Sequence, residues 1–211
     1  MYNMDGYLPL FPLKLVAFPD EPINLHIFEP RYKQLINDIL ETGDPFGIAV
    51  YIDSLMPFGT EVQLLDVSKL YEDGRMDIKT KALGVFEILS FDNPMPGKLY
   101  AGGKVSFKEN DLKVPELIYR EFLFYLKELL RLLNHPVDLV PFAVNSFSFA
   151  HKIGLTLAEE YELLTMEKES DRIAYLLRHL MKVIPVMREM EAAKKKIQMN
   201  GHFKNLDPLD F

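Results

Sequence analysis

Histidines are the residues of this sequence whose chemistry could most readily hold a metal ion or move a proton. None of the five has a second histidine at the spacing of a zinc motif, and no His-Glu-x-x-His string occurs. An active site needs several such groups converging on one point, and the chain offers no such constellation. We therefore interpret them as structural or solvated and predict no metal, cofactor or catalytic role. The five are His26, His135, His151, His179 and His202.

Carboxylates are more numerous, and three groups stand close together in the chain. Acid–base catalysis requires two carboxylates that face each other in a cleft with separated pKa values. These groups instead follow helix surfaces and first turns, where they complement the helix dipole. Solvated faces are the favoured interpretation. The groups are Glu159-Glu160, Glu167-Glu169-Asp171 and Glu189-Glu191.

Ser148 and Lys152 are a possible nucleophile–base pair, because residues four apart share a face of a helix. Ser146 lies on the same stretch. No glycine-rich turn and no oxyanion-hole signature surrounds them, so we interpret all three as surface residues. Cysteine is absent from the 211 residues, which excludes disulfides and thiolate chemistry. The sequence predicts a protein that is not an enzyme.

Composition narrows the class further. No apolar run approaches the roughly 18 residues of a membrane span, and the N-terminus lacks the basic segment of a signal peptide. Together with the lack of cysteine, this favours a cytoplasmic protein without membrane partners. The net charge of −7 makes a phosphate-binding surface less favoured, so nucleic acid is not the expected partner.

The elements that must position any site change character near residue 112. Before it, short segments rich in β-branched and aromatic residues predict strands at 8–15, 25–28, 46–52, 61–71, 76–89 and 99–107. Prolines 9, 12, 19 and 22 predict edge or bulged strands. One amphipathic helix is inserted, beginning at Pro30 and ending at Gly43. A small, mostly antiparallel barrel is the predicted fold of this part.

The second part has helical periodicity. We predict helices over 114–133 and about 140–152, a third that begins with the capping box of Thr156 and Glu159, and a fourth capped by Ser170 or Asp171. Pro185 is expected to kink or split the fourth helix. The predicted domains are a barrel at 1–110, a helical bundle at 111–199 and a tail at 200–211. The tail, with its Leu206–Phe211 run, either docks on a partner or is disordered.

Several strings, taken in order, resemble one known family. They are LPLFPL at 8–13, AFPDEPINLHIFEPRYKQLI at 17–36, PFGIAVYI at 45–52, EDGRMDIKTKALGVFEIL at 72–89 and GLTLAEEYELLTMEKESDRIAYL at 154–176. They are similar to the N-terminal, substrate-binding domain of Lon proteases. Asp20 stands where the family has glycine, in a turn whose left-handed conformation Asp tolerates. Val85 replaces the family's arginine, which leaves any role of that arginine in doubt here.

The resemblance implies an α+β fold, a PUA-like six-stranded barrel followed by a helical bundle. It also implies a stand-alone form without the ATPase and protease parts, since the sequence has no G-x-x-x-x-G-K-[ST] motif. The implied function is non-catalytic recognition of unfolded or tagged polypeptide, with a protease or chaperone as a further partner. PUA-like barrels also occur in RNA-binding proteins, so RNA binding is the alternative.

Six residues are candidate contacts for polypeptide. Glu29 and Arg31 flank Pro30, where they either line a peptide groove or serve only to hold the helix start. Met56 and Phe58 in one predicted loop, and Met95 in another, are adaptable apolar contacts unless they are buried against the other subdomain. Phe124 falls on the charged face of the first long helix, where extra packing is the competing interpretation.

Overall fold

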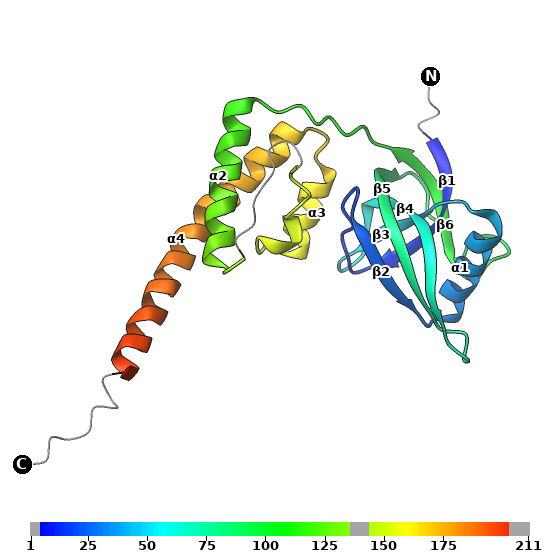
Figure 1. Ribbon diagram of the computed structural model, residues 1–211. Coiled ribbons are helices and arrows are strands. Elements are labelled where there is room, and N and C mark those ends of the chain that lie inside the picture. The colour runs from blue at the N-terminus through cyan, green and yellow to red at the C-terminus, as the bar shows by residue number, and fades with distance from the viewer. Residues whose placement is uncertain (1–4, 136–143, 203–211) are drawn as a thin grey trace, which may run out of the picture. The chain divides into compact units, whose positions relative to one another are not determined.

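The computed structural model describes residues 5–135 and 144–202 (Figure 1). Its contacts group the chain into two units. The sheet unit comprises Met1–Leu112 and Phe147–Glu169, and the helical unit comprises Lys113–Ser146 and Ser170–Phe211. Both units are therefore built from two separated stretches of chain. The contiguous domains expected at 1–110 and 111–199 divide the chain differently, since they place 147–169 with the helices.

Six strands form the sheet unit. They are β1 (Asp5–Leu13), β2 (Pro22–Ile27), β3 (Phe46–Tyr51), β4 (Leu55–Leu70), β5 (Met76–Ile88) and β6 (Ala101–Phe107). Their order is β2-β5-β4-β3-β1-β6, and a further pairing of β5 with β6 closes the sheet on itself (Figure 1). Only the pair β1–β3 is parallel among the described strands. The mostly antiparallel sheet predicted from the sequence is confirmed.

Strand β1 contains Pro9 and Pro12, yet it has neighbours on both sides. The expectation of an edge strand is wrong for β1 as a whole. Strand β6 pairs with Asp5–Leu10 and β3 with Leu10–Leu13, so each half of β1 keeps one unpaired side. A proline nitrogen, which has no proton to donate, can lie on that side without breaking the ladder.

The sheet closes tightly around Phe86, whose side chain is fully buried. Gly59 on the adjacent strand β4 and Gly47 on β3 lie against its ring. A Cβ atom at either glycine would lie 2.7 Å from Phe86 Cζ, which is closer than carbon atoms approach in proteins. These glycines therefore let two strand backbones approach the aromatic side chain.

Helix α1 (Pro30–Thr42) is inserted between β2 and β3, as the sequence predicts. Proline occupies its start, and Gly43 ends it in the left-handed conformation at φ 75°, with its N–H donating to Ile39 O at 2.8 Å. Its buried face joins the larger apolar core of the sheet unit. Asp20 adopts φ 67°, so the predicted left-handed turn at this position is confirmed.

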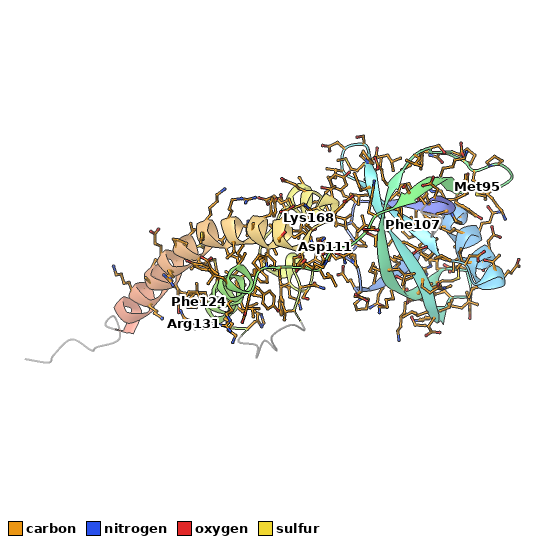
Figure 2. All side chains as sticks on the ribbon, turned by 90° about the horizontal axis from the view of Figure 1, so that it is seen from above. Met95, Phe107, Asp111, Phe124, Arg131 and Lys168 are labelled. Carbon is orange, nitrogen blue, oxygen red and sulfur yellow. The ribbon has the colours of Figure 1, made fainter. Side chains whose placement is uncertain are left out.

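The segment 147–169 belongs to the sheet unit. It holds the 3-10 turn η1 (Ala150–Lys152) and helix α3 (Leu157–Thr165), which begins with the predicted capping box of Thr156 and Glu159. The helix expected over 140–152 is wrong for 144–149, which form no helix, and 140–143 lie outside the described residues. Asp111 and Lys168 pair as a parallel bridge and lie beside each other in Figure 2.

The helical unit contains α2 (Glu116–Leu132) and α4 (Glu169–His202). Helix α4 starts slightly before the predicted cap at Ser170 or Asp171 and runs through Pro185 as one element, so the predicted split is wrong. Beyond Ile184, none of its described side chains is buried. No helix in the described ranges is both long and apolar enough to cross a membrane.

Candidate functional site

A pocket of about 500 Å³ opens in the sheet unit, within the range of roughly 300–1,000 Å³ typical of ligand sites. Its walls come from β1, from the C-terminal half of α1 with the residues that follow, and from the loop before β6. They are Tyr7, Leu8, Pro9, Asp38, Ile39, Thr42, Asp44, Pro45, Lys98 and Tyr100.

One corner of the pocket is polar and fixed. Asp38 Oδ2 accepts hydrogen bonds from Lys98 Nζ and from Tyr100 Oη, each at 2.7 Å. The hydrogen bond from the Lys98 ammonium lowers the pKa of Asp38, which keeps the carboxylate charged near neutral pH. Burial, with the hydrogen bond to Asp38, raises the pKa of Tyr100 far above its ordinary value, so the phenol stays a donor.

The part of the lining next to β6 is formed by Tyr7, and Met95 lies near it. Tyr7 donates to Asp92 Oδ2 at 2.9 Å. The Tyr7 ring and Met95 Sδ both lie over Gly102, where a Cβ atom would come within 2.9 Å of the ring and 3.1 Å of the sulfur. Met95 is in the loop between β5 and β6, as expected (Figure 2), and it is half-buried against the core. Tyr7 lines the pocket but Met95 does not, so the part of Met95 in polypeptide binding stays a prediction.

Another part of the lining is apolar. Leu8 and Pro9 from β1 face the pocket together with Ile39 from α1 and Pro45, which follows that helix. Leu8 and Ile39 are almost fully buried, so this wall is held rigidly by the core behind it. The pocket thus combines an apolar wall with a charged corner, the arrangement that recognises an amphipathic group.

Comparison with known proteins assigns the chain to a family. The model of the ATP-dependent protease La (LON) substrate-binding domain matches residues 7–182, most of the 211-residue chain. The chain belongs to the Lon substrate-binding domain family.

Solved structures of Lon N-terminal domains share this fold. The Lon N-terminal domain protein from Xanthomonas campestris is 25% identical with a TM-score of 0.65, covering 82% of this chain and 98% of that one. The N-terminal domain of the Mycobacterium avium complex Lon protease is 14% identical with a TM-score of 0.63, covering 83% and 98%. The fold class predicted from the Lon resemblance is confirmed.

Glu29 and Arg31 lie at the start of α1 in this Lon-type domain. Arg31 pairs with Glu29 at 2.8 Å and stacks over the Tyr32 ring at 4.5 Å from its centroid. Arg31 precedes Asp38, the first lining residue of α1, by seven positions, which is about 10 Å along the helix axis. Neither Glu29 nor Arg31 lines the pocket, and their part in polypeptide binding stays a prediction.

Met56 and Phe58 do not lie in a loop, as the sequence suggested, but in β4. Pro57 misled the prediction, since β4 starts at Leu55 and tolerates the proline. Phe58 is half-buried: its ring meets Tyr161 of α3 edge-on at 6.4 Å, and its N–H donates to Tyr161 Oη at 3.2 Å. This contact within the sheet unit occupies part of the Phe58 surface.

Phe124 is different, because its side chain is 65% exposed on α2 of the helical unit (Figure 2). Tyr125 is its aromatic neighbour, with ring centroids 5.4 Å apart. The role of Phe124 as a contact for polypeptide stays a prediction. Phe124 belongs to the helical unit and the pocket to the sheet unit.

None of the residues that line the pocket was predicted from the sequence as a contact for polypeptide. Asp38 and Lys98 are 60 positions apart, and no motif links them. A signal existed in α1, where Asp38 and Thr42 share a polar face at helical spacing, but its partners lie on other elements.

The remaining chemically active side chains have structural partners. The interpretation of Ser146 as a surface residue is wrong, because its side chain is buried and accepts a hydrogen bond from the buried Arg172 at 3.0 Å. Ser148 and Lys152 are exposed, and they share no α-helix, since Lys152 ends the short turn η1. The described residues contain no group of three or more His, Asp or Glu arranged to hold a metal ion.

Proposed function

We propose that this protein binds unfolded or tagged polypeptide in extended form, without chemistry of its own, and acts in proteolysis as an adaptor or regulator. The observation that carries the proposal is the match to a substrate-binding domain over residues 7–182. A protease or chaperone that receives the bound chain is the expected partner, and the cytoplasm is the expected location.

The pocket supports this proposal because extended chains offer side chains and backbone rather than a folded surface. Its apolar lining is backed by the core of the sheet unit. Met95, in the loop between β5 and β6, is a flexible side chain that adapts to different partners. Phe124 offers a second, exposed aromatic contact on the helical unit. Ordering an extended chain costs entropy, so each contact is expected to be weak.

RNA binding, the alternative from the sequence, has less support. Many basic side chains of the described ranges lie beside carboxylates. Arg75 pairs with Asp73 at 2.7 Å, Lys108 with Glu87 at 2.6 Å and Arg131 with Glu128 at 3.0 Å. A nucleic-acid surface needs its cations free to face phosphates.

The test is fluorescence anisotropy of a labelled, permanently unfolded protein titrated with the chain. The same protein in folded form and a labelled RNA hairpin are measured in parallel. We expect saturable binding to the unfolded protein alone. No binding up to about 1 mM, an affinity of only about −4 kcal/mol, would overturn the proposal, and salt-sensitive retention of the hairpin would favour RNA instead.

A further inference from the structure

We infer that the pocket between α1, β1 and the loop before β6 selects a basic side chain, lysine or arginine, of the bound polypeptide. The inference rests on the proposed function and adds a ligand class to it. Such a side chain has an apolar stem and a cationic head, and the pocket has a wall suited to each.

The charges of the lining favour a cation. It contains two carboxylates, Asp38 and Asp44, and one ammonium, Lys98. The Lys98 ammonium is already paired with Asp38 at 2.7 Å. Asp44 is exposed and forms no ion pair with any described residue. The negative charge of Asp44 is therefore left uncompensated within the pocket.

A second acceptor is available at Asp38. Both of its hydrogen bonds, from Lys98 and Tyr100, reach Oδ2. Oδ1 of the same carboxylate accepts none from the described residues, so it can accept one from an incoming ammonium or guanidinium group. Asp92, held by Tyr7 at 2.9 Å, adds negative charge beside the rim. These carboxylates would repel a carboxylate of the bound polypeptide. The Lys98 ammonium, already paired with Asp38, would not be free to offset this repulsion.

The stem has a separate place to lie. Pro9, Ile39 and Pro45 form the apolar part of the lining. The methylene groups of lysine or arginine can cover such a wall while the charged end reaches Asp44. A shorter or uncharged side chain would satisfy only one of the two walls.

The experiment compares capped peptides that are identical except at a central residue, which is Lys, Arg, norleucine, Gln or Glu. All other residues of the peptides are uncharged. Capping removes the terminal charges. Affinity for the full chain is measured by competition with the labelled unfolded protein. We expect the Lys and Arg peptides to bind about threefold to tenfold more tightly than norleucine, with the preference shrinking as salt is raised.

Three variants test which residues cause the preference for a basic side chain. Asp44→Asn is expected to remove most of the preference for Lys, and Thr42→Trp, at the exposed end of α1, should fill the pocket and weaken every peptide. Asp66→Asn, an exposed carboxylate on β4 outside the lining, is the matched control and should leave the preference intact. Thermal unfolding of each variant verifies that the fold is kept.

The outcomes separate the two proposals. The inference that the pocket selects a basic side chain is overturned if the norleucine peptide binds equally or more tightly, or if the preference survives Asp44→Asn. Either result leaves the proposed binding of polypeptide in place. If unfolded protein binds but Thr42→Trp has no effect on any peptide, the pocket is not the site. If neither peptides nor unfolded protein bind, the proposed function fails as well.

Discussion

His151 Nε2 lies 3.1 Å from Oε2 of Glu21, a residue 130 positions earlier in the chain. The other ring nitrogen of His151 lies 2.7 Å from Oε1 of Glu160 in α3. One imidazole thus joins the turn after β1 to the 147–169 segment within the sheet unit. Phe18 and Phe147 stack beside it, with centroids 5.1 Å apart.

The first prediction concerns alkaline pH. The hydrogen bond to Glu21, with that to Glu160, raises the pKa of His151 to about 9 from about 6.5. A raised pKa means that the stabilisation is complete below the unfolded value and is lost as pH rises through about 9. We expect the unfolding free energy to fall by on the order of 1 kcal/mol across that range, since the side chain is partly exposed.

His151→Phe should abolish this loss, because it removes the titrating group while keeping an aromatic ring beside Phe18. Urea unfolding of both proteins at pH 7 and pH 10 gives the comparison. Other groups also titrate at pH 10, so the difference between the two proteins is the quantity of interest. Equal changes in the two proteins would contradict the ion-pair interpretation.

Glu21 leads to the opposite expectation in acid. Burial, the largest single effect, acts to raise its pKa. The hydrogen bonds from His151 and from the Phe18 N–H, together with the charges of His151 and Lys152, outweigh burial, and the net pKa is lowered. A lowered carboxyl pKa stabilises the folded protein at pH values above the ordinary pKa of 4.5, and this stabilisation is lost as the pH falls below that value. Glu21→Gln should therefore show a smaller loss of unfolding free energy than the unmodified protein between pH 6 and pH 3, measured by urea unfolding.

A methyl group added at Gly59 should be poorly tolerated. Its Cβ would meet the Ile48 carbonyl oxygen and lie 2.7 Å from Phe86 Cζ, and the backbone of β3 cannot move away cheaply. We expect Gly59→Ala to lower the unfolding free energy by about 2–4 kcal/mol. Gly84→Ala in β5 is the control, because a Cβ there has no neighbour within 4 Å. Similar losses in the two variants would count against the tight closure around Phe86.

The capping box of α3 gives a smaller effect. Thr156 Oγ1 accepts from the Glu159 N–H at 3.3 Å, and the Glu159 carboxylate accepts from the Thr156 N–H at 2.8 Å. We expect Thr156→Ala to cost about 1 kcal/mol of unfolding free energy and Thr156→Ser to cost little. Chemical denaturation of the three proteins tests this, and an equal cost for Ser and Ala would argue against capping by the hydroxyl.

Phe124 should affect binding without affecting stability. Its ring is 65% exposed, so Phe124→Ser is expected to change the unfolding free energy by less than about 0.5 kcal/mol. Phe122 is buried on the same helix, so Phe122→Ala should lower the unfolding free energy by about 3–5 kcal/mol. If α2 contributes to polypeptide binding, Phe124→Ser weakens anisotropy binding of the unfolded protein; unchanged affinity would remove Phe124 from the candidate contacts.

Features governed by neighbours in the chain were predictable from the sequence. The left-handed Asp20, the Gly43 end of α1 and the capping box of Thr156 each depend on a few consecutive residues. Their physics is local, so residue type and spacing were sufficient. The order of the strings resembling Lon carried the fold class in the same way, since it encodes the order of the elements.

Features that depend on distant pairing were not predictable. Pro57 was read as a loop residue, but β4 extends past it because β3 and β5 hold the strand on both sides. Asp38 meets Lys98 and Tyr100 only after the sheet has closed and α1 has packed. No residue spacing within one element predicts such a contact, so the pocket could be found only from the tertiary structure.

The discontinuous sheet unit has a consequence during synthesis. A ribosome that has made residues 1–112 has produced all six strands, but not η1, α3 or the chain that pairs with Asp111. His151, Tyr161 and Lys168 must emerge before Glu21, Phe58 and Asp111 find their partners. The nascent strands therefore lack these partners while α2, which belongs to the helical unit, is synthesised. The length of that delay is set by residues 113–146, and the sheet unit becomes complete only when residue 169 leaves the exit tunnel.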